Sequence, residues 1–391
     1  MTTSISKPRI QSIDLLKGLV MVVMALDHVR DYFHYSAFFF DPTDPTQSTL
    51  PIFFTRFITH FCAPAFSFLA GLSAFMIGKR KPINELSCFL FKRGLWLVFV
   101  EIIIISFAWK FDIQFRHIGL QTIWSLGVSM IFLAGLIYLP KKMILAFSLV
   151  IIFGHNLLDN IHFDGNFWWA MLHERQKFEF AEGHTVVFAY SLLPWIAVMS
   201  LGYCFGSLYE ATFNAEKRKK ILNGLGLGSL ALFFILIAIN KYGDPVQWTN
   251  YGDISKTLMS IFNVNKYPPS LLYLIITLGC SFIFLANAEK LKGKVVNFFC
   301  VFGRVPFFYY IIHIYLIHLI AAFAAYFTGF DWKALVLPTF ITRVEVLKGY
   351  GFNLIMVYLI WIFVIVLLYP MCKKFDRYKQ AHKEKWWLSY L

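Results

Sequence analysis

Apolar residues fill most of this chain in long runs, and polar residues gather in short stretches between the runs. A helix that spans a bilayer needs about 20 mostly apolar residues, and a window of that length finds ten candidates. The predicted spans are Ile13–Tyr35, Pro51–Ile77, Leu86–Trp109, Thr122–Leu139, Met143–Leu158, Thr185–Tyr209, Ile221–Asn240, Ser270–Ala286, Pro306–Phe327 and Phe352–Pro370. The short apolar segment Ala334–Thr342 is compatible with a re-entrant piece, so nine and eleven spans are alternatives. The pattern predicts an all-α fold, a polytopic membrane bundle in a single domain over residues 1–391.

Composition supports a membrane protein. Of the 391 residues 58% are hydrophobic and 15% are charged, whereas ordinary soluble domains carry about 25% charge. This excludes a soluble enzyme, a disordered chain and a fibrous protein. The net charge of +14 comes without a basic patch interleaved with aromatic residues, so nucleic acid is not an expected partner. The six cysteines lack close spacing and are expected to fill apolar space.

Basic residues indicate the orientation in the membrane. Twenty-four of the 36 Lys and Arg, Lys7 and Arg9 among them, fall on one side of the predicted bundle or in the tail 371–391. By the positive-inside rule both termini and this basic tail are cytoplasmic. The inner loops are expected to be short basic turns, whereas the outer loops 159–184 and 241–269 are long enough to form a cap. The first span is expected to be a retained helix, and a bacterial inner membrane is the favoured location.

The first predicted span carries ionisable residues where apolar ones are expected. Such groups at bilayer depth mark functional sites by default. His28 follows Lys17 by eleven residues, which places it about 16 Å further along a helix and on nearly the same face. A cation below and an imidazole above suit a reaction across the membrane, with an anionic donor from the cytoplasm and His28 as the base. The alternative is a helix that stops near Leu26, with Asp27, Arg30 and Asp31 in water.

Other polar residues supply further candidates. Asp27 points about 100° away from His28, so it or Asp31 is expected to pair with Arg30 or Arg56. His34 lies six residues beyond His28 and is a second candidate base.

Two more sets of polar residues lie in apolar segments. His313 and His318 are five residues apart, which does not suit metal chelation from one helix face, and hydrogen bonding between helices is an equal alternative to catalysis for both. His155 and Asp159 share a helix face and are expected to form a hydrogen-bonded pair toward the outer cavity. Glu101 is a lone carboxylate among aliphatic residues.

Several motifs resemble those of a known family. They are the segment from Arg9 to Leu19 with its continuation from Met24 to Arg30, the segment 190–195 (YSLLPW), the segment 266–272 (KYPPSLL), and the segment 302–307 (FGRVPF) with His313. Together they resemble the membrane acetyltransferases related to heparan-alpha-glucosaminide N-acetyltransferase, over nearly the whole chain.

The resemblance also suggests which residues act. The wider acyltransferase superfamily has an arginine in its first helix, followed eleven residues later by a catalytic histidine. That spacing falls on Lys17 and His28, so a lysine replaces the arginine and the bidentate guanidinium is lost. The lysosomal enzyme resembles this chain with an asparagine at the position of His28 and its catalytic histidine further outward. His34 is the nearest match to that outer histidine.

The resemblance implies an acyltransferase with acetyl-CoA or another acyl-CoA as the co-substrate and no metal. The acyl-CoA enters from the cytoplasm, guided by Lys17 and Arg304, and an amino sugar or saccharide hydroxyl accepts the acyl group outside. His28, His34 and Asp27 are the candidate catalytic residues. The candidate substrate-binding residues are Arg30, His155, Asp159, Lys266 and His313. Transfer through a covalent histidine intermediate and direct transfer both stay open, as does a homodimer.

Two other classes of protein are compatible with the same pattern. A proton-coupled secondary transporter or a carrier of lipid-linked sugars would use the same intramembrane histidines and charges. A sensor or scaffold would tolerate replacement of His28. Binding of an acyl-CoA separates the first alternative from an acyltransferase.

Overall fold

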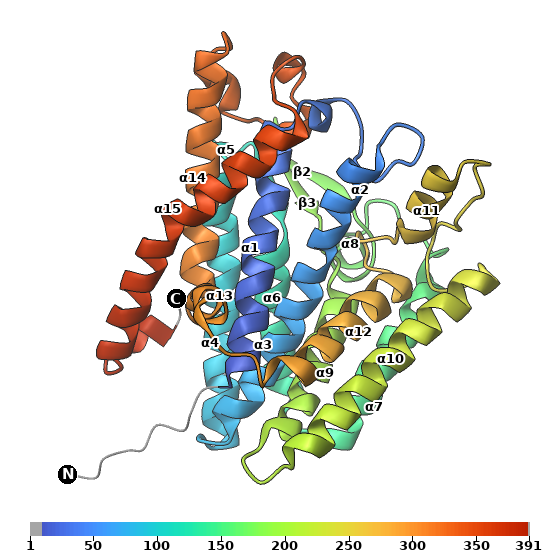
Figure 1. Cartoon of the computed structure of the whole chain (residues 1–391), viewed down its shortest axis with the longest axis vertical. Coiled ribbons are helices and arrows are strands. Elements are labelled where there is room, and N and C mark those ends of the chain that lie inside the picture. The colour runs from blue at the N-terminus through green and yellow to red at the C-terminus, as the bar shows by residue number, and fades with distance from the viewer. Residues whose placement is uncertain (1–9, 390–391) are drawn as a thin grey trace.

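The computed structural model describes residues 10–389 and consists mainly of helices that run along one another (Figure 1). A helix stands at each of the ten predicted spans. In chain order they are α1 (Gln11–Phe33), α2 to α3 (Leu50–Phe57, Ile58–Phe61 and Cys62–Gly78), α4 to α5 (Ile83–Val100, Glu101–Ile105 and Ser106–Lys110), α6 (Thr122–Leu136), α7 (Lys141–Gly154), α9 (Leu192–Phe205), α10 (Ala215–Ile239), α12 (Leu271–Ala288), α14 (Pro306–Phe327) and α15 (Leu354–Ala381). Seven of these segments are long and apolar enough to span a membrane by length and composition alone. The all-α polytopic membrane bundle predicted from the sequence is confirmed.

Several boundaries differ from the prediction by a few residues, and three differences change the fold. The sixth span begins at Leu192 and not at Thr185, because residues 184–188 form a strand. The last helix continues past Pro370 to Ala381, so half of the predicted basic tail is helical. The inner loop after α12 is more than a turn, because it contains the helix α13 (Lys294–Arg304), whose apolar face is buried.

The strand belongs to a small sheet that the all-α prediction did not contain. β1 (His117–Leu120), β2 (Lys177–Ala181) and β3 (His184–Phe188) form a sheet in the order β1-β3-β2. β3 is parallel to β1 and antiparallel to β2. The strands of this sheet are too short to give a clear alternation in the sequence, and β1 pairs with β3 across 68 positions of the chain, for example His117 with Thr185.

Both ends of the bundle can be followed in Figure 1. The first residues of α1 and the last residues of α15 lie at the same end, together with the turn between α3 and α4 and the start of α10. We call this end the inner end and the opposite end, which carries the sheet, the outer end. Lys7 and Arg9, which contributed to the topology prediction, lie outside the described residues, as do residues 390–391.

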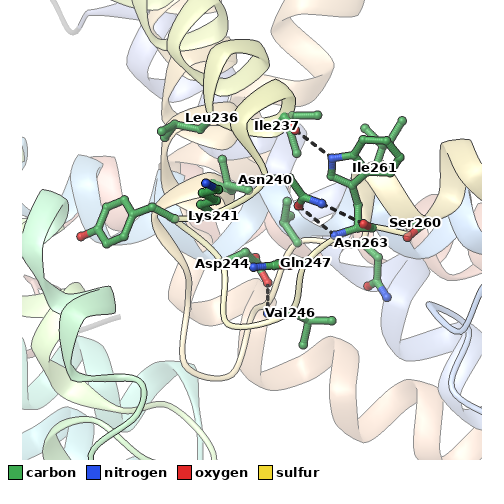
Figure 2. A pocket seen from close by; sticks show the side chains of 14 residues that line it. Leu236, Ile237, Asn240, Lys241, Asp244, Val246, Gln247, Ser260, Ile261 and Asn263 are labelled. Atoms are coloured by element: carbon green, nitrogen blue, oxygen red, sulfur yellow. Dashed lines mark hydrogen bonds between the residues drawn. The ribbon is translucent and has the colours of Figure 1, made fainter. Parts of the chain in front are cut away.

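The two long outer loops have structure of their own. The first contains α8 (Phe167–Leu172) and β2, and the second contains α11 (Ile254–Phe262). In the second loop Asn240 exchanges hydrogen bonds with the backbone of Trp248, and the indole of Trp248 donates to the carbonyl of Ile237 at 2.8 Å. Figure 2 shows Asn240, Asp244 and Ser260 around a small pocket at this place. These contacts fasten the loop to the outer end of α10.

Glycines bring four pairs of helices into backbone contact. A Cβ atom at Gly303 of α13 would lie 1.8 Å from the carbonyl oxygen of Asp14, and one at Gly18 of α1 would lie 1.9 Å from that of Phe299. Small residues permit such close approach between membrane helices, where the bilayer supplies little hydrophobic force to bring helices together. The same reciprocal arrangement joins Gly71 to Gly202, Gly94 to Gly127, and Gly226 to Gly279.

We expect Gly303→Ala to destabilise the protein, because its methyl group has no space against α1. Overpacking costs roughly 1–3 kcal/mol, and the melting temperature of the purified protein in detergent measures the loss. Gly228→Ala is the matched control, since no atom lies within 4 Å of a Cβ atom there. Equal melting temperatures for the two variants would contradict the contact between α1 and α13.

Candidate functional site

The charged residues in the outer half of α1 are buried and paired. The carboxylate of Asp27 pairs with Arg56 and lies 2.9 Å from a guanidinium nitrogen of Arg30. Arg30 also donates to Asp31 at 2.5 Å. The predicted pairing of Asp27 and Asp31 with Arg30 and Arg56 is therefore confirmed. The alternative of a helix that ends near Leu26 in water is wrong, because α1 continues to Phe33 and Arg30 is only 3% exposed.

Two histidines from distant parts of the chain meet in the middle of the bundle. His28 Nδ1 lies 2.7 Å from His313 Nε2, which joins α1 to α14. His313 Nδ1 lies 3.0 Å from the carbonyl oxygen of Tyr309. A carbonyl can only accept, so His313 Nδ1 carries the proton and its neutral ring accepts at Nε2. His28 Nδ1 is then the donor, and His28 Nε2 keeps its lone pair.

His28 lies in the wall of a cavity that we call the central cavity. The space between its lining atoms is about 580 Å³, open solvent included. It is lined by Met24, Asp27, His28, Asp31, Arg56, Thr59, Cys62, Ala63, Phe66, Trp109, Gln121, Thr122, Tyr190, Lys266, Tyr267 and Tyr310. No residue within 10–389 donates to or accepts from His28 Nε2. A basic nitrogen is therefore available to a molecule in this cavity.

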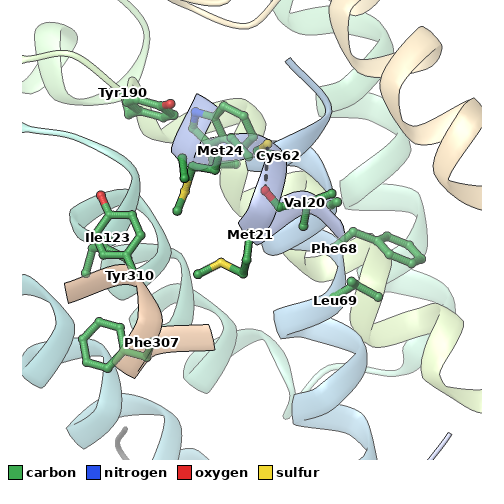
Figure 3. Packing of buried hydrophobic residues seen from close by; sticks show 14 of the residues in the cluster. Val20, Met21, Met24, Cys62, Phe68, Leu69, Ile123, Tyr190, Phe307 and Tyr310 are labelled. Carbon is green, nitrogen blue, oxygen red and sulfur yellow. Dashed lines mark hydrogen bonds between the residues drawn. The ribbon is translucent and has the colours of Figure 1, made fainter. Parts of the chain in front are cut away.

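A larger and mostly apolar cavity, the inner cavity, lies toward the inner end. Its space is about 1090 Å³, open solvent included, and Lys17 and Arg93 are the two cations in its wall. Phe66, Thr122 and Tyr310 line both this cavity and the central cavity. Figure 3 shows several of the apolar side chains in these walls, with Tyr310 between Phe307 and Tyr190.

A third cavity, the outer cavity, lies on the other side of the central one. Its space is about 1380 Å³, open solvent included, and its wall is polar and aromatic. Five residues line both the central and the outer cavity: Asp31, Arg56, Trp109, Gln121 and Tyr267. The three cavities thus follow one another along α1, and His28 lies in the wall of the middle one.

The predicted ligand-binding cations have different surroundings. Lys17 lines the inner cavity and donates to the hydroxyl of Ser73 at 3.0 Å. Lys266 lines the central cavity beside His28. Arg304 does not line any of the three cavities, because it lies at the end of α13 and its Nε donates to Asp376 of α15 at 2.7 Å. Arg93, one of the basic residues that the topology prediction placed on the cytoplasmic side, is the second cation of the inner cavity.

Three other predicted site residues lie away from the cavities. His34 is 1% exposed and its Nδ1 lies 2.6 Å from Ser36 Oγ, at the start of a turn of 3₁₀ helix after α1. The predicted pair of His155 and Asp159 does not form. His155 Nε2 bonds instead to the carbonyl oxygen of Pro269, at 2.8 Å, and Asp159 lies 3.2 Å from His173. The i,i+4 spacing failed here because the helix tightens into a 3₁₀ turn at His155.

Two buried polar residues have structural partners. Glu101 lies in a π-helical turn and accepts hydrogen bonds from the backbone of Gln121, Ile123 and Trp124 at the start of α6. Both ring nitrogens of His318 lie 2.8 Å from backbone carbonyl oxygens. Of the two alternatives for His318, hydrogen bonding and catalysis, the structure therefore shows hydrogen bonding.

The fold and this site define a polytopic membrane protein with a histidine pair at a central cavity, which lies between an inner and an outer cavity. Comparison with known families places it more closely. Residues 9–238 match the family described as heparan-alpha-glucosaminide N-acetyltransferase, catalytic. The chain belongs to this family of membrane acetyltransferases. The match covers α1 with His28 and ends in α10, so Lys266, Arg304 and His313 lie beyond it. No curated protein matches the chain at a significant level.

Proposed function

We propose that this chain transfers an acetyl group from cytoplasmic acetyl-CoA to an amino sugar or a saccharide hydroxyl on the outer side of a bacterial inner membrane. The observation that carries the proposal is the position of His28. It lines a cavity that shares wall residues with the inner cavity on one side and with the outer cavity on the other. A donor and an acceptor from opposite sides can thus approach the same imidazole.

The inner cavity suits the donor. Its apolar walls would hold the acyl group and the adjoining arm of an acyl-CoA, and Lys17 and Arg93 would attract phosphates. The lysine supplies charge without the bidentate geometry of an arginine, and Arg93 supplies the guanidinium. Together the two residues would supply the charge and the guanidinium that a single arginine supplies at the position of Lys17 in the superfamily.

The histidine pair suits proton removal from the acceptor. His28 Nε2 accepts the proton of the attacking amine or hydroxyl, and the acetyl carbonyl carbon bonds to the acceptor as the bond to the thiol sulfur breaks. His313 would hold His28 in the useful tautomer by accepting a hydrogen bond from its Nδ1–H. The same nitrogen serves a covalent or a direct route.

The first test is release of free CoA thiol by the purified protein, with acetyl-CoA and glucosamine as substrates. We expect His28→Ala to lower kcat by about 10²-fold or more, the usual contribution of a general base, and to leave acetyl-CoA binding by calorimetry unchanged. His162→Ala, an exposed outer-loop histidine, is the control and should keep full activity. A folded wild-type protein that binds no acyl-CoA would contradict the proposal and favour the transporter.

The second test concerns the role of His313 as a positioning residue. His313→Phe cannot accept from His28, and we expect kcat to fall by about tenfold or more while KM for acetyl-CoA stays the same. His313→Gln keeps an acceptor oxygen and should restore most of the rate. Equal rates for the two variants at equal melting temperature would show that His313 only fills space.

A further inference from the structure

The outer cavity carries more positive than negative charge. Five cationic side chains line it, and they come from separate parts of the chain: Arg30, Arg56, Lys110, Arg175 and Arg343. Two carboxylates, Asp31 and Asp41, line it as well, and Asp27 pairs with Arg56 from the adjoining central cavity. Five cations against three carboxylates leave an excess of two positive charges around the outer cavity.

Two of these cations are buried and have donors that no group satisfies. Lys110 is 2% exposed, and its Nζ has no hydrogen-bond partner within the described residues. Its acidic neighbours are engaged elsewhere, Glu101 with the backbone of α6 and Asp112 with Arg116. Arg30 is 3% exposed, and its Nε and Nη1 also have no partner in the described chain. Buried donors without an acceptor are costly, so an anion bound beside these nitrogens would accept hydrogen bonds that the described residues do not.

The rim of the cavity adds two exposed arginines. Arg175 follows α8, and Arg343 ends the 3₁₀ turn Ile341–Arg343. Neither forms an ion pair with another residue of the described part of the chain. The guanidinium of Arg175 lies 5.5 Å from the ring centroid of Tyr267, which lines the same cavity. Guanidinium groups match the geometry of phosphate oxygens and bind them with paired hydrogen bonds.

We propose that the outer cavity is a binding site for a phosphate group carried by the acceptor, so that the acceptor is a phosphorylated saccharide. A phosphate monoester is close to a dianion at neutral pH, which matches the excess of two cations. The aromatic rings of Phe39, Phe40 and Phe340 in the same wall offer flat faces to a sugar ring. The role of the saccharide as acceptor rests on the proposed function, but its binding here does not.

The test measures binding without acyl-CoA. Glucosamine 6-phosphate, inorganic phosphate, unphosphorylated glucosamine and short-chain phosphatidylglycerol are titrated by calorimetry into the wild-type protein in detergent. We expect glucosamine 6-phosphate to bind at least about tenfold more tightly than glucosamine. The double variant Arg175→Gln/Arg343→Gln should lose this preference, whereas the control Lys177→Gln/Lys333→Gln, which removes the same charge from exposed positions outside the cavity lining, should keep it.

Three outcomes would overturn the proposal. These are equal affinity for glucosamine and its 6-phosphate, a preference that survives in the arginine variant, and binding of short-chain phosphatidylglycerol in place of the sugar phosphate. A failure of the proposed acetyltransferase function would give a different set of results. Tight binding of glucosamine 6-phosphate without any thiol release from acetyl-CoA would keep the phosphate site and refute the acetyltransferase, whereas transfer to glucosamine without a phosphate preference would do the reverse.

Discussion

Charged residues are costly inside an apolar bundle unless they find partners there, and the outer half of α1 depends on this constraint. Asp27, Arg30 and Asp31 are buried together and Arg56 completes the group, because isolated ions at bilayer depth are expensive. The group fixes the rotation of α1 and of the segment that carries Arg56. That rotation turns His28 toward α14 and leaves one face of α1 along all three cavities.

The contact between His28 and His313 determines which of their ring nitrogens carry protons. The Tyr309 carbonyl can only accept a hydrogen bond, so the proton of neutral His313 is on Nδ1. The proton of His28 is then on its own Nδ1, which donates to His313 Nε2. The basic nitrogen that results does not depend on a carboxylate beside the imidazole, and Asp27 is free to neutralise arginines instead. Neighbouring residues on one helix therefore have separate partners, with Asp27 paired to arginines and His28 paired to His313.

Close helix packing fixes the position of α1, which carries the site residues. Gly18 and Gly303 hold the inner half of α1 against α13, and the ion pairs hold its outer half. Between them the helix lines an apolar cavity and then a polar one. The inner cavity can thus remain apolar with two cations at its wall, while the outer cavity collects arginines from parts of the chain that are distant in the sequence.

The sequence by itself determined the membrane class and the ten helical segments, and it placed ionisable residues, His28 among them, inside the first segment, because long apolar runs and the charges within them are local signals. It also determined the family, through motifs along the chain. Only the tertiary structure decided that His313 is the partner of His28, that Arg93 joins Lys17, and that Lys110, Arg175 and Arg343 face one cavity. These residues lie far apart in the chain, and their meeting depends on helix packing and loop paths, which periodicity does not encode. The i,i+4 prediction for His155 and Asp159 failed for the same reason, since tertiary contacts changed the local helix.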